Sequence, residues 1–266
     1  MFIIGGMDMK IEKALFLVPV PMAGEFSEGE NGKVLPERNA RIVAEIRNFI
    51  VESRKSAVRF LISLDKNFPI DECTFTELSE HTAAGADLSH LLDPIEKEGK
   101  PMGVISDAGC PAVGDPGSRA VELAHRKNIR VVPLVGPNSM ILALMASGFN
   151  GQNFAFNGYL PVKGGERESK LRQLESRAIK EDQTQLFIEA PYRNAKMFEA
   201  IIKTCADGTR LCVAAGITGD GEFIKTRTIR EWKKCEPPEI DKVPAIFLIY
   251  KGTENARGSG KNAQKR

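Results

Sequence analysis

The sequence predicts an α/β protein with two α/β domains, the first built on a mostly parallel sheet and the second on a mixed sheet. Three observations lead to this fold class. Short apolar runs alternate with amphipathic segments up to about residue 150, which is typical of parallel strands joined by helices. Beyond that point several strand-like runs follow one another with fewer helices between them. The length of 266 residues permits two domains of modest size.

The first half alternates between the two kinds of element. Short apolar runs such as ALFLVPV predict buried strands, and apolar residues at helical spacing predict amphipathic helices. Gly99 and Gly148 follow helical segments as C-caps. The expected elements are a strand at 14–20, a loop at 21–33, one or two helices within 36–64, a strand at 73–78, a helix at 88–97, a strand at 102–105, a loop at 106–117, a helix at 118–127, a strand at 129–134 and a helix at 138–146.

The second half contains strands at 154–159, 185–189, 210–214, 223–229 and 245–250, and helices at 166–179 and 194–205. The chain is therefore expected to comprise an N-terminal extension (1–10), a first domain (11–150), a second domain (151–252) and a tail (253–266). The tail is polar and basic and has almost no apolar side chains, which predicts disorder.

Composition excludes several classes of protein. Hydrophobic residues make up 42% and charged residues 27%, which is ordinary for a soluble globular chain. A formal net charge of +2 does not predict nucleic-acid binding from charge alone. The five cysteines contain no C-x-x-C pair and there are three histidines, so neither a zinc site nor a disulfide framework is expected. Without a signal peptide or a long apolar run, the chain is expected in the reducing cytoplasm.

Residues 106–117 (SDAGCPAVGDPG) leave the preceding strand and lead into a helix. Loops at the carboxyl ends of strands in open α/β sheets bind ligands. Gly109, Gly114 and Gly117 permit backbone conformations that other residues resist, and Ala108 is small enough to let a ligand lie against the main chain. The order of glycines matches neither a Rossmann dinucleotide site nor a P-loop. The loop alone therefore predicts either a ligand-binding turn or a tight connection.

Several segments resemble, in the expected order, motifs of the tetrapyrrole methylase superfamily, which comprises class III S-adenosylmethionine-dependent methyltransferases. Residues 106–117 resemble its Ser-Asp-Ala-Gly-Thr-Pro…Ser-Asp-Pro-Gly segment. The resemblance is closest to the branch that methylates a cytidine ribose 2′-hydroxyl in small-subunit ribosomal RNA. The remaining motifs are 132–139 (VPLVGPNS), 158–163 (GYLPVK), 189–193 (EAPYR) and 245–252 (AIFLIYKG), with weaker matches at 18–24 (VPVPMAG), 52–54 (ESR) and 80–82 (EHT).

The resemblance implies two α/β domains with S-adenosylmethionine in the cleft between them. It also implies a homodimer, with ribosomal RNA or the small ribosomal subunit as partner and no metal ion. Backbone groups, small apolar residues and a carboxylate suit a zwitterionic, cationic nucleoside. The implied cofactor-binding residues are Pro21, Met22, Ser106, Asp107, Ala108, Gly109, Val113, Asp115, Gly136, Pro137, Ser139, Leu160 and Pro161.

Two assignments within this site remain open. Asp107 or Asp115 could face the sulfonium cation or a ribose hydroxyl, but Asp115 could equally cap the helix at 118–127. A ribose hydroxyl is a poor nucleophile, so a nearby base or cation would assist transfer. The resemblance favours Glu189, Arg193 and Arg54 for this task, whereas each would otherwise be a surface ion pair or a cap. The wider set of candidates contains Glu52, Glu80 and His81, and Tyr192 stands where the branch has His.

The chain departs from the branch at residues 215–219 (AGITG), where an Arg-Glu-Leu-Thr-Lys motif is expected. Three hypotheses follow. An RNA ribose methyltransferase would carry a basic face on the cleft. A methyltransferase for a small molecule would have an enclosed apolar trough, and a binding protein without turnover would hold S-adenosylmethionine alone. The residues expected on the basic face are Arg54, Lys163, Arg167, Lys170, Arg172 and Arg193.

Overall fold

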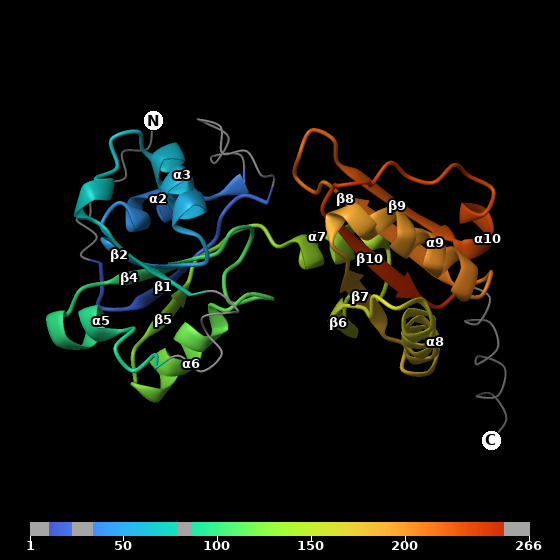
Figure 1. Cartoon of the computed structure of the whole chain (residues 1–266), viewed down its shortest axis with the longest axis horizontal. Coiled ribbons are helices and arrows are strands. Elements are labelled where there is room, and N and C mark those ends of the chain that lie inside the picture. Colours follow the sequence, from blue (N-terminus) through green and yellow to red (C-terminus); the bar gives the residue numbers. More distant parts are fainter. Residues whose placement is uncertain (1–10, 23–33, 79–86, 253–266) are drawn as a thin grey trace, which may run out of the picture. The chain divides into compact units, whose positions relative to one another are not determined.

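The computed structural model describes residues 11–22, 34–78 and 87–252. The chain divides into two compact units, Met1–Asn138 and Ser139–Arg266. Each unit is built on its own five-stranded sheet, as Figure 1 shows. The predicted fold class, a parallel sheet followed by a mixed sheet with helices, is confirmed. The N-terminal extension, part of the loop at 21–33, residues 79–86 and the tail lie outside the described residues.

The first sheet is parallel throughout, with the strand order β3-β2-β4-β1-β5. The strands of this sheet and the helices that pack against it all belong to the first unit, which also contains a 3₁₀ turn. In chain order the elements are β1 (Leu15–Val18), α2 (Glu37–Val43), β2 (Asn48–Val51), α3 (Arg54–Leu64), η1 (Ile70–Glu72), β3 (Thr74–Glu77), α5 (Asp93–Glu98), β4 (Met102–Ile105), α6 (Ser118–Arg126) and β5 (Val131–Pro133).

Alternate residues of these strands enter two different cores, one on each face of the sheet. Phe16, Phe49 and Ile105 pack with side chains of α2 and α3, whereas Leu15 and Ile50 pack with side chains of α5 and α6. Figure 1 shows the two pairs of helices on opposite sides of the sheet. All five parallel strands therefore present their carboxyl ends at one edge, where the loop 106–117 begins.

One expectation for this unit was wrong. Residues 36–64 were expected to form one or two helices, but Asn48–Val51 between α2 and α3 form strand β2, which pairs with β3 and β4. A short apolar run has no period of its own, so strand and buried helix look alike in sequence. The predicted cap at Gly99 is present, with a left-handed φ of 68°.

The second sheet is mixed, with the order β6-β7-β10-β8-β9; β6 and β7 are parallel and the other pairs are antiparallel. Its first helix, α7, contacts β9 and β10 and so belongs to this unit. The sequence boundary was placed later, near residue 150. The elements are α7 (Ser139–Ser147), β6 (Phe154–Tyr159), α8 (Gly164–Lys180), β7 (Thr184–Ile188), η2 (Pro191–Arg193), α9 (Asn194–Thr204), β8 (Arg210–Ala215), β9 (Phe223–Thr228), α10 (Ile229–Trp232) and β10 (Ala245–Tyr250).

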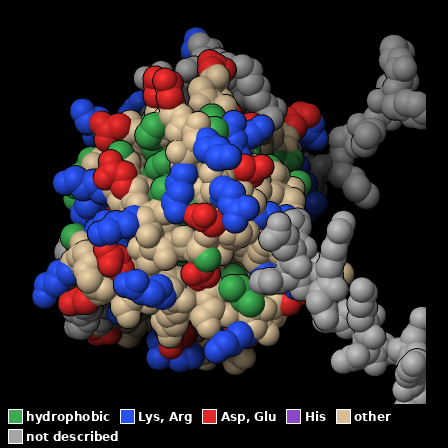
Figure 2. All heavy atoms as spheres, turned by 90° about the vertical axis from the view of Figure 1, so that its right-hand side faces the viewer, with side chains coloured by type: hydrophobic (Ala, Val, Ile, Leu, Met, Phe, Trp, Pro, Cys, Tyr) green, Lys and Arg blue, Asp and Glu red, His purple; other side chains and the backbone are tan. Residues whose placement is uncertain are grey.

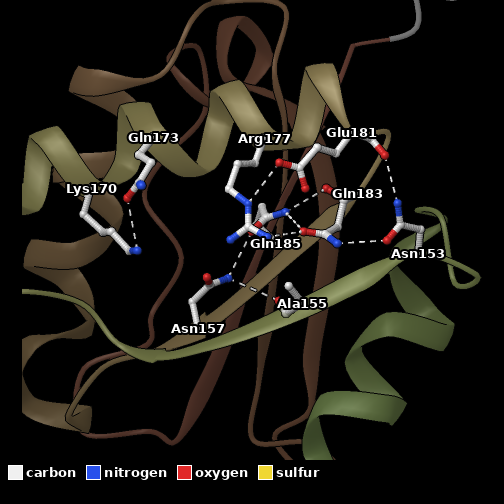
Figure 3. Close-up of polar contacts among 9 residues, drawn as sticks. All are labelled: Asn153, Ala155, Asn157, Lys170, Gln173, Arg177, Glu181, Gln183 and Gln185. Carbon is white, nitrogen blue, oxygen red and sulfur yellow. Dashed lines mark hydrogen bonds and ion pairs between the residues drawn. The ribbon is translucent and has the colours of Figure 1, made fainter.

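The core of the second unit lies between this sheet and helices α8, α9 and α10. A network of polar side chains links α8 and β7 to the edge strand β6 (Figure 3). Gln185 is fully buried. Its Nε2 donates to Gln183 Oε1 at 2.9 Å, and its Oε1 accepts from Asn157 Nδ2 at 3.2 Å. Arg177 of α8 donates to the same Gln183 oxygen at 3.0 Å. These bonds fix β6 against β7 and α8.

Candidate functional site

The loop 106–117 takes its path from the Asp115 carboxylate. Asp115 Oδ1 accepts hydrogen bonds from the backbone N–H of Ala112 at 2.9 Å and of Gly117 at 2.7 Å. Burial raises the pKa of Asp115, while the two N–H bonds oppose the shift. Gly117 occupies the N-cap position of α6, so Asp115 is not the N-cap that the sequence also allowed. The carboxylate instead holds the loop closed three residues before the helix begins.

Three segments that the sequence singled out meet in the first unit. Val20 and Gly109 exchange two backbone hydrogen bonds of 2.9 and 3.2 Å. A Cβ placed on Gly109, whose φ is 69°, would lie 3.5 Å from the carbonyl oxygen of Pro137 and 3.8 Å from Met22 Cγ. The Cys110 thiol donates to that same carbonyl at 3.3 Å. These contacts hold together the segments that follow β1, β4 and β5, with the side-chain-free backbone of Gly109 between them.

The tip of the loop is open to solvent. Asp107, Ala108 and Val113 are exposed, whereas Ser106 is buried and its hydroxyl donates to the Ala108 carbonyl at 3.0 Å. The Asp107 N–H donates to Glu52 Oε2 at 3.3 Å, which ties the loop to the end of β2. The tip of the loop thus presents the exposed Asp107 carboxylate beside accessible main chain.

The remaining predicted cofactor residues lie outside the loop 106–117. Gly136 lies against Pro19, and Pro21 is buried at the exit of β1. Ser139, Leu160 and Pro161 belong to the second unit, where Leu160 is 3% exposed and Ser139 begins α7. Their part in binding a cofactor stays a prediction.

Glu189, Tyr192 and Arg193 form a compact cluster after β7. Glu189 Oε1 accepts from Arg193 Nε at 2.9 Å and from Arg193 Nη2 at 2.6 Å. Arg193 Nη1 donates to the Tyr192 hydroxyl at 2.7 Å, and the guanidinium carbon lies 5.0 Å from the centre of the Tyr192 ring. The hydrogen bonds that Arg193 donates to Glu189 raise the pKa of the guanidinium. The guanidinium is therefore held in one orientation on top of the tyrosine.

Arg54 starts helix α3 and its side chain is exposed. Its guanidinium carbon lies 5.6 Å above the centre of the Phe75 ring, and its backbone N–H donates to Glu77 Oε1 at 3.0 Å. Arg54 and Arg193 lie in different units. Glu80 and His81, the other candidates from the resemblance, lie outside the described residues.

Comparison with known proteins assigns the family. No protein-family model matches the chain. The ribosomal RNA small subunit methyltransferase I of Buchnera aphidicola subsp. Schizaphis graminum is 30% identical over 241 residues, which cover 88% of this chain and 77% of that protein. The chain belongs to this family. The protein of the same name from Pseudomonas aeruginosa is 32% identical over 217 residues, covering 82% of this chain and 71% of that protein.

A solved structure supports the fold independently. The methyltransferase CobJ has a TM-score of 0.51 and 16% sequence identity, with 82% of this chain and 89% of that chain covered. Membership of the small subunit methyltransferase I family makes the chain a methyltransferase. The predicted resemblance to the tetrapyrrole methylase superfamily and to its ribosomal RNA branch is confirmed.

Several basic side chains expected on an RNA-binding face already have partners within the protein. Arg167 is only 8% exposed, and its guanidinium donates to the carbonyls of Pro161 and Val162. The expectation that Arg167 contributes to the face was therefore wrong: the long side chain satisfies the backbone at the start of α8. Arg172 forms an ion pair of 3.4 Å with Glu168. Glu168 also forms an ion pair with Lys203. The Glu168–Arg172 pair has the (i, i+4) spacing of neighbours on a helix, whereas the contact of Glu168 with Lys203 joins α8 to α9 and could not be read from local sequence.

At 215–219, where the branch has a charged motif, the chain makes a tight turn between β8 and β9. Gly216 and Thr218 have φ values of 58° and 70°, and the Thr218 N–H donates to Glu222 Oε2 at 3.0 Å. In the described part of the chain no group of His, Cys, Asp or Glu residues could hold a metal ion. None of the described helices is long and apolar enough to cross a membrane.

Proposed function

We propose that this protein transfers a methyl group from S-adenosylmethionine to a ribose 2′-hydroxyl of small-subunit ribosomal RNA. The observation that carries the proposal is the similarity, over 88% and 82% of this chain, to two relatives named ribosomal RNA small subunit methyltransferase I. The motif at 189–193 and the loop 106–117 lie in the order that the ribosomal RNA branch has. Cytoplasmic location and a homodimer belong to the same proposal.

The loop 106–117 fits the proposed methyl donor. S-adenosylmethionine supplies a methyl group activated by a sulfonium cation. An exposed Asp107 carboxylate can balance a positive charge, and the exposed Ala108, whose side chain is small, lets a flat nucleoside lie against the main chain. In the proposed site Ser106, Ala108, Val113 and Gly136 line the same cradle. Ser139, Leu160 and Pro161 of the second unit remain predicted cofactor-binding residues.

The chain's own contribution to the reaction is alignment and exclusion of water. Methyl transfer is an in-line displacement, so the acceptor oxygen must be held on the axis of the bond that breaks. The acceptor hydroxyl loses its proton during transfer, and a fixed cation lowers the energy of the oxygen as negative charge develops. Two hydrogen bonds to Glu189 orient Arg193 for such a role, whereas the exposed Arg54 side chain has a contact with the Phe75 ring.

A transfer assay tests the proposal. Small ribosomal subunits from a strain that lacks the protein are offered with S-adenosylmethionine carrying a labelled methyl group. The wild-type protein should label the ribosomal RNA. Asp107→Ala should bind the donor more weakly, whereas Asp71→Ala, an exposed carboxylate of the same unit, should behave like the wild type.

Two outcomes separate the alternatives. Binding of S-adenosylmethionine without transfer to the subunits would overturn the ribosomal RNA assignment and favour a small-molecule acceptor or a binding protein without turnover. Calorimetry that detects no binding of S-adenosylmethionine at all would refute the proposed cofactor.

A further inference from the structure

The cluster after β7 presents unusually exposed aromatic surface. The chain has three tyrosines. Two of them stand here, Tyr192 with 64% and Tyr159 with 65% of its surface exposed, and Val162 close behind Tyr159 in the chain is 60% exposed. Exposed apolar and aromatic side chains that gather at one place mark interaction sites. The concentration of tyrosine at one place therefore points to an interaction surface.

Tyr159 reaches this place through a break in its strand. The register between β6 and β7 shifts after Phe156, so that Tyr159 pairs with Ile188, the residue before Glu189. Gly158 has a φ of 62° at the shift. Such bulges re-aim side chains and occur near functional sites. The Tyr159 phenol also lies close enough to Arg193 to raise the pKa of the guanidinium.

Tyr192 offers one covered and one open ring face. The guanidinium of Arg193 lies over the ring, with its carbon 5.0 Å from the ring centre. With most of the residue exposed, the other side of the ring is free to stack. A flat ring backed by a guanidinium is a stacking surface for nucleobases, and the cation strengthens the stack.

Arg193 keeps hydrogen-bonding capacity for a ligand. An arginine side chain has five N–H donors. Its Nε–H and one Nη2–H point to Glu189 Oε1, and one Nη1–H points to the Tyr192 hydroxyl. Two N–H groups thus have no partner among the described residues. They suit the oxygens of a ribose, a phosphate or a base edge.

Glu189 acts on the ligand only through Arg193. Its side chain is fully buried, and Oε1 also accepts from the Ala190 N–H at 2.8 Å. The second oxygen, Oε2, is buried and has no hydrogen-bond partner in the part of the chain that the structure describes. Buried polar atoms are nearly always satisfied, so packing alone does not account for this arrangement. An inaccessible carboxylate cannot take a proton from an acceptor hydroxyl, and Glu189 is a positioning residue.

We propose that Tyr192, Arg193 and Tyr159 hold an unpaired nucleotide of the RNA substrate, with its base stacked on the open face of Tyr192. This inference rests on the proposed function. An RNA ligand is favoured over a protein because the open ring lies beside spare cationic N–H donors, which match a base and its sugar–phosphate together. Ribose methylation requires an accessible nucleotide, and unpaired nucleotides are the part of RNA that aromatic side chains recognise.

The test compares Tyr192→Ala, Tyr192→Phe and a control, Phe154→Ala, which removes a ring that is 41% exposed on β6. Methyl transfer to unmodified small subunits gives kcat and KM, and fluorescence anisotropy measures binding of a labelled single-stranded RNA. Tyr192→Ala should raise KM and weaken RNA binding about tenfold. Tyr192→Phe should retain most binding because the ring remains, and Phe154→Ala should match the wild type. Calorimetry should give unchanged affinity for S-adenosylmethionine in all three variants.

Equal RNA binding by Tyr192→Ala and the wild type would overturn the inference. Weaker binding to subunits with unchanged binding to free RNA would also overturn it, in favour of a ribosomal protein as the partner. Failure of the proposed function looks different, because the wild type would then bind RNA without labelling it. Glu189→Gln separates positioning from base catalysis: a higher KM with an unchanged pH dependence of kcat is expected, and loss of the ascending limb of that profile would make Glu189 a base.

Discussion

Asp115 makes a single carboxylate oxygen responsible for the shape of the loop 106–117. Oδ1 accepts two backbone N–H bonds. Asp115→Ala should destabilise the protein by about 1–3 kcal/mol, because two partly buried donors lose their acceptor. Asp115→Asn keeps an oxygen in the same place and should cost less. Urea unfolding of both variants measures the difference, and equal losses would show that the carboxylate charge, not the acceptor, stabilises the loop.

The same residue makes a prediction about pH. Burial raises the pKa of Asp115 above its ordinary value of 3.8. A raised folded pKa means that the folded protein favours the protonated acid, so the stability contributed by Asp115 is greatest below pH 3.8 and is lost as pH rises through the folded pKa. The free energy of unfolding of the wild type relative to that of Asp115→Asn should therefore fall as pH rises from 3.8 through the folded pKa. A relative stability that rises with pH would contradict the assigned cause.

At the scale of the elements, the sequence predicted best those strands whose side chains are buried on both faces of a sheet. Strands β4 and β10 were predicted to the residue, because each is an apolar run that both faces of its sheet bury. Strand β2 was missed, since its four residues have no period and its partners β3 and β4 lie far along the chain. Motifs located the loop 106–117 and the cluster at 189–193. They could not give the bond from Asp107 to Glu52, which spans 55 positions.

The connection after β5 is an element whose position depends on one glycine. A Cβ on Gly136 would lie 2.3 Å from both Cβ and Cγ of Pro19, a rigid ring that cannot turn away. Gly136→Ala should push residues 136–137 away from Gly109 and weaken binding of S-adenosylmethionine about tenfold or more. Gly165→Ala is the matched control, because nothing lies within 4 Å of a Cβ at that site. Calorimetry that finds equal affinities would remove this connection from the proposed cofactor site.

At the scale of the whole molecule, charge is nearly balanced and finely mixed. The formal net charge is +2, and Figure 2 shows basic and acidic side chains interspersed on the face it presents. Asp207, for example, pairs with both Arg230 and Lys233. Cations that are already neutralised release few counterions when RNA binds. Affinity for RNA must then come from local contacts more than from a general electrostatic field.

This balance predicts a shallow salt dependence. If the protein neutralises about three phosphates of a single strand, the logarithm of the association constant should fall with the logarithm of salt concentration with a slope of about −2. Anisotropy with single-stranded RNA from about 50 to 200 mM KCl measures it. Tyr192→Ala should weaken binding equally at every salt concentration and leave the slope unchanged, because a ring contributes stacking and no charge. A chain ending at Gly252 lacks Arg257, Lys261, Lys265 and Arg266 and is the control for the basic tail. A slope steeper than about −6 that survives this truncation would show a broad phosphate-binding surface and contradict an affinity built on the Tyr192–Arg193 cluster.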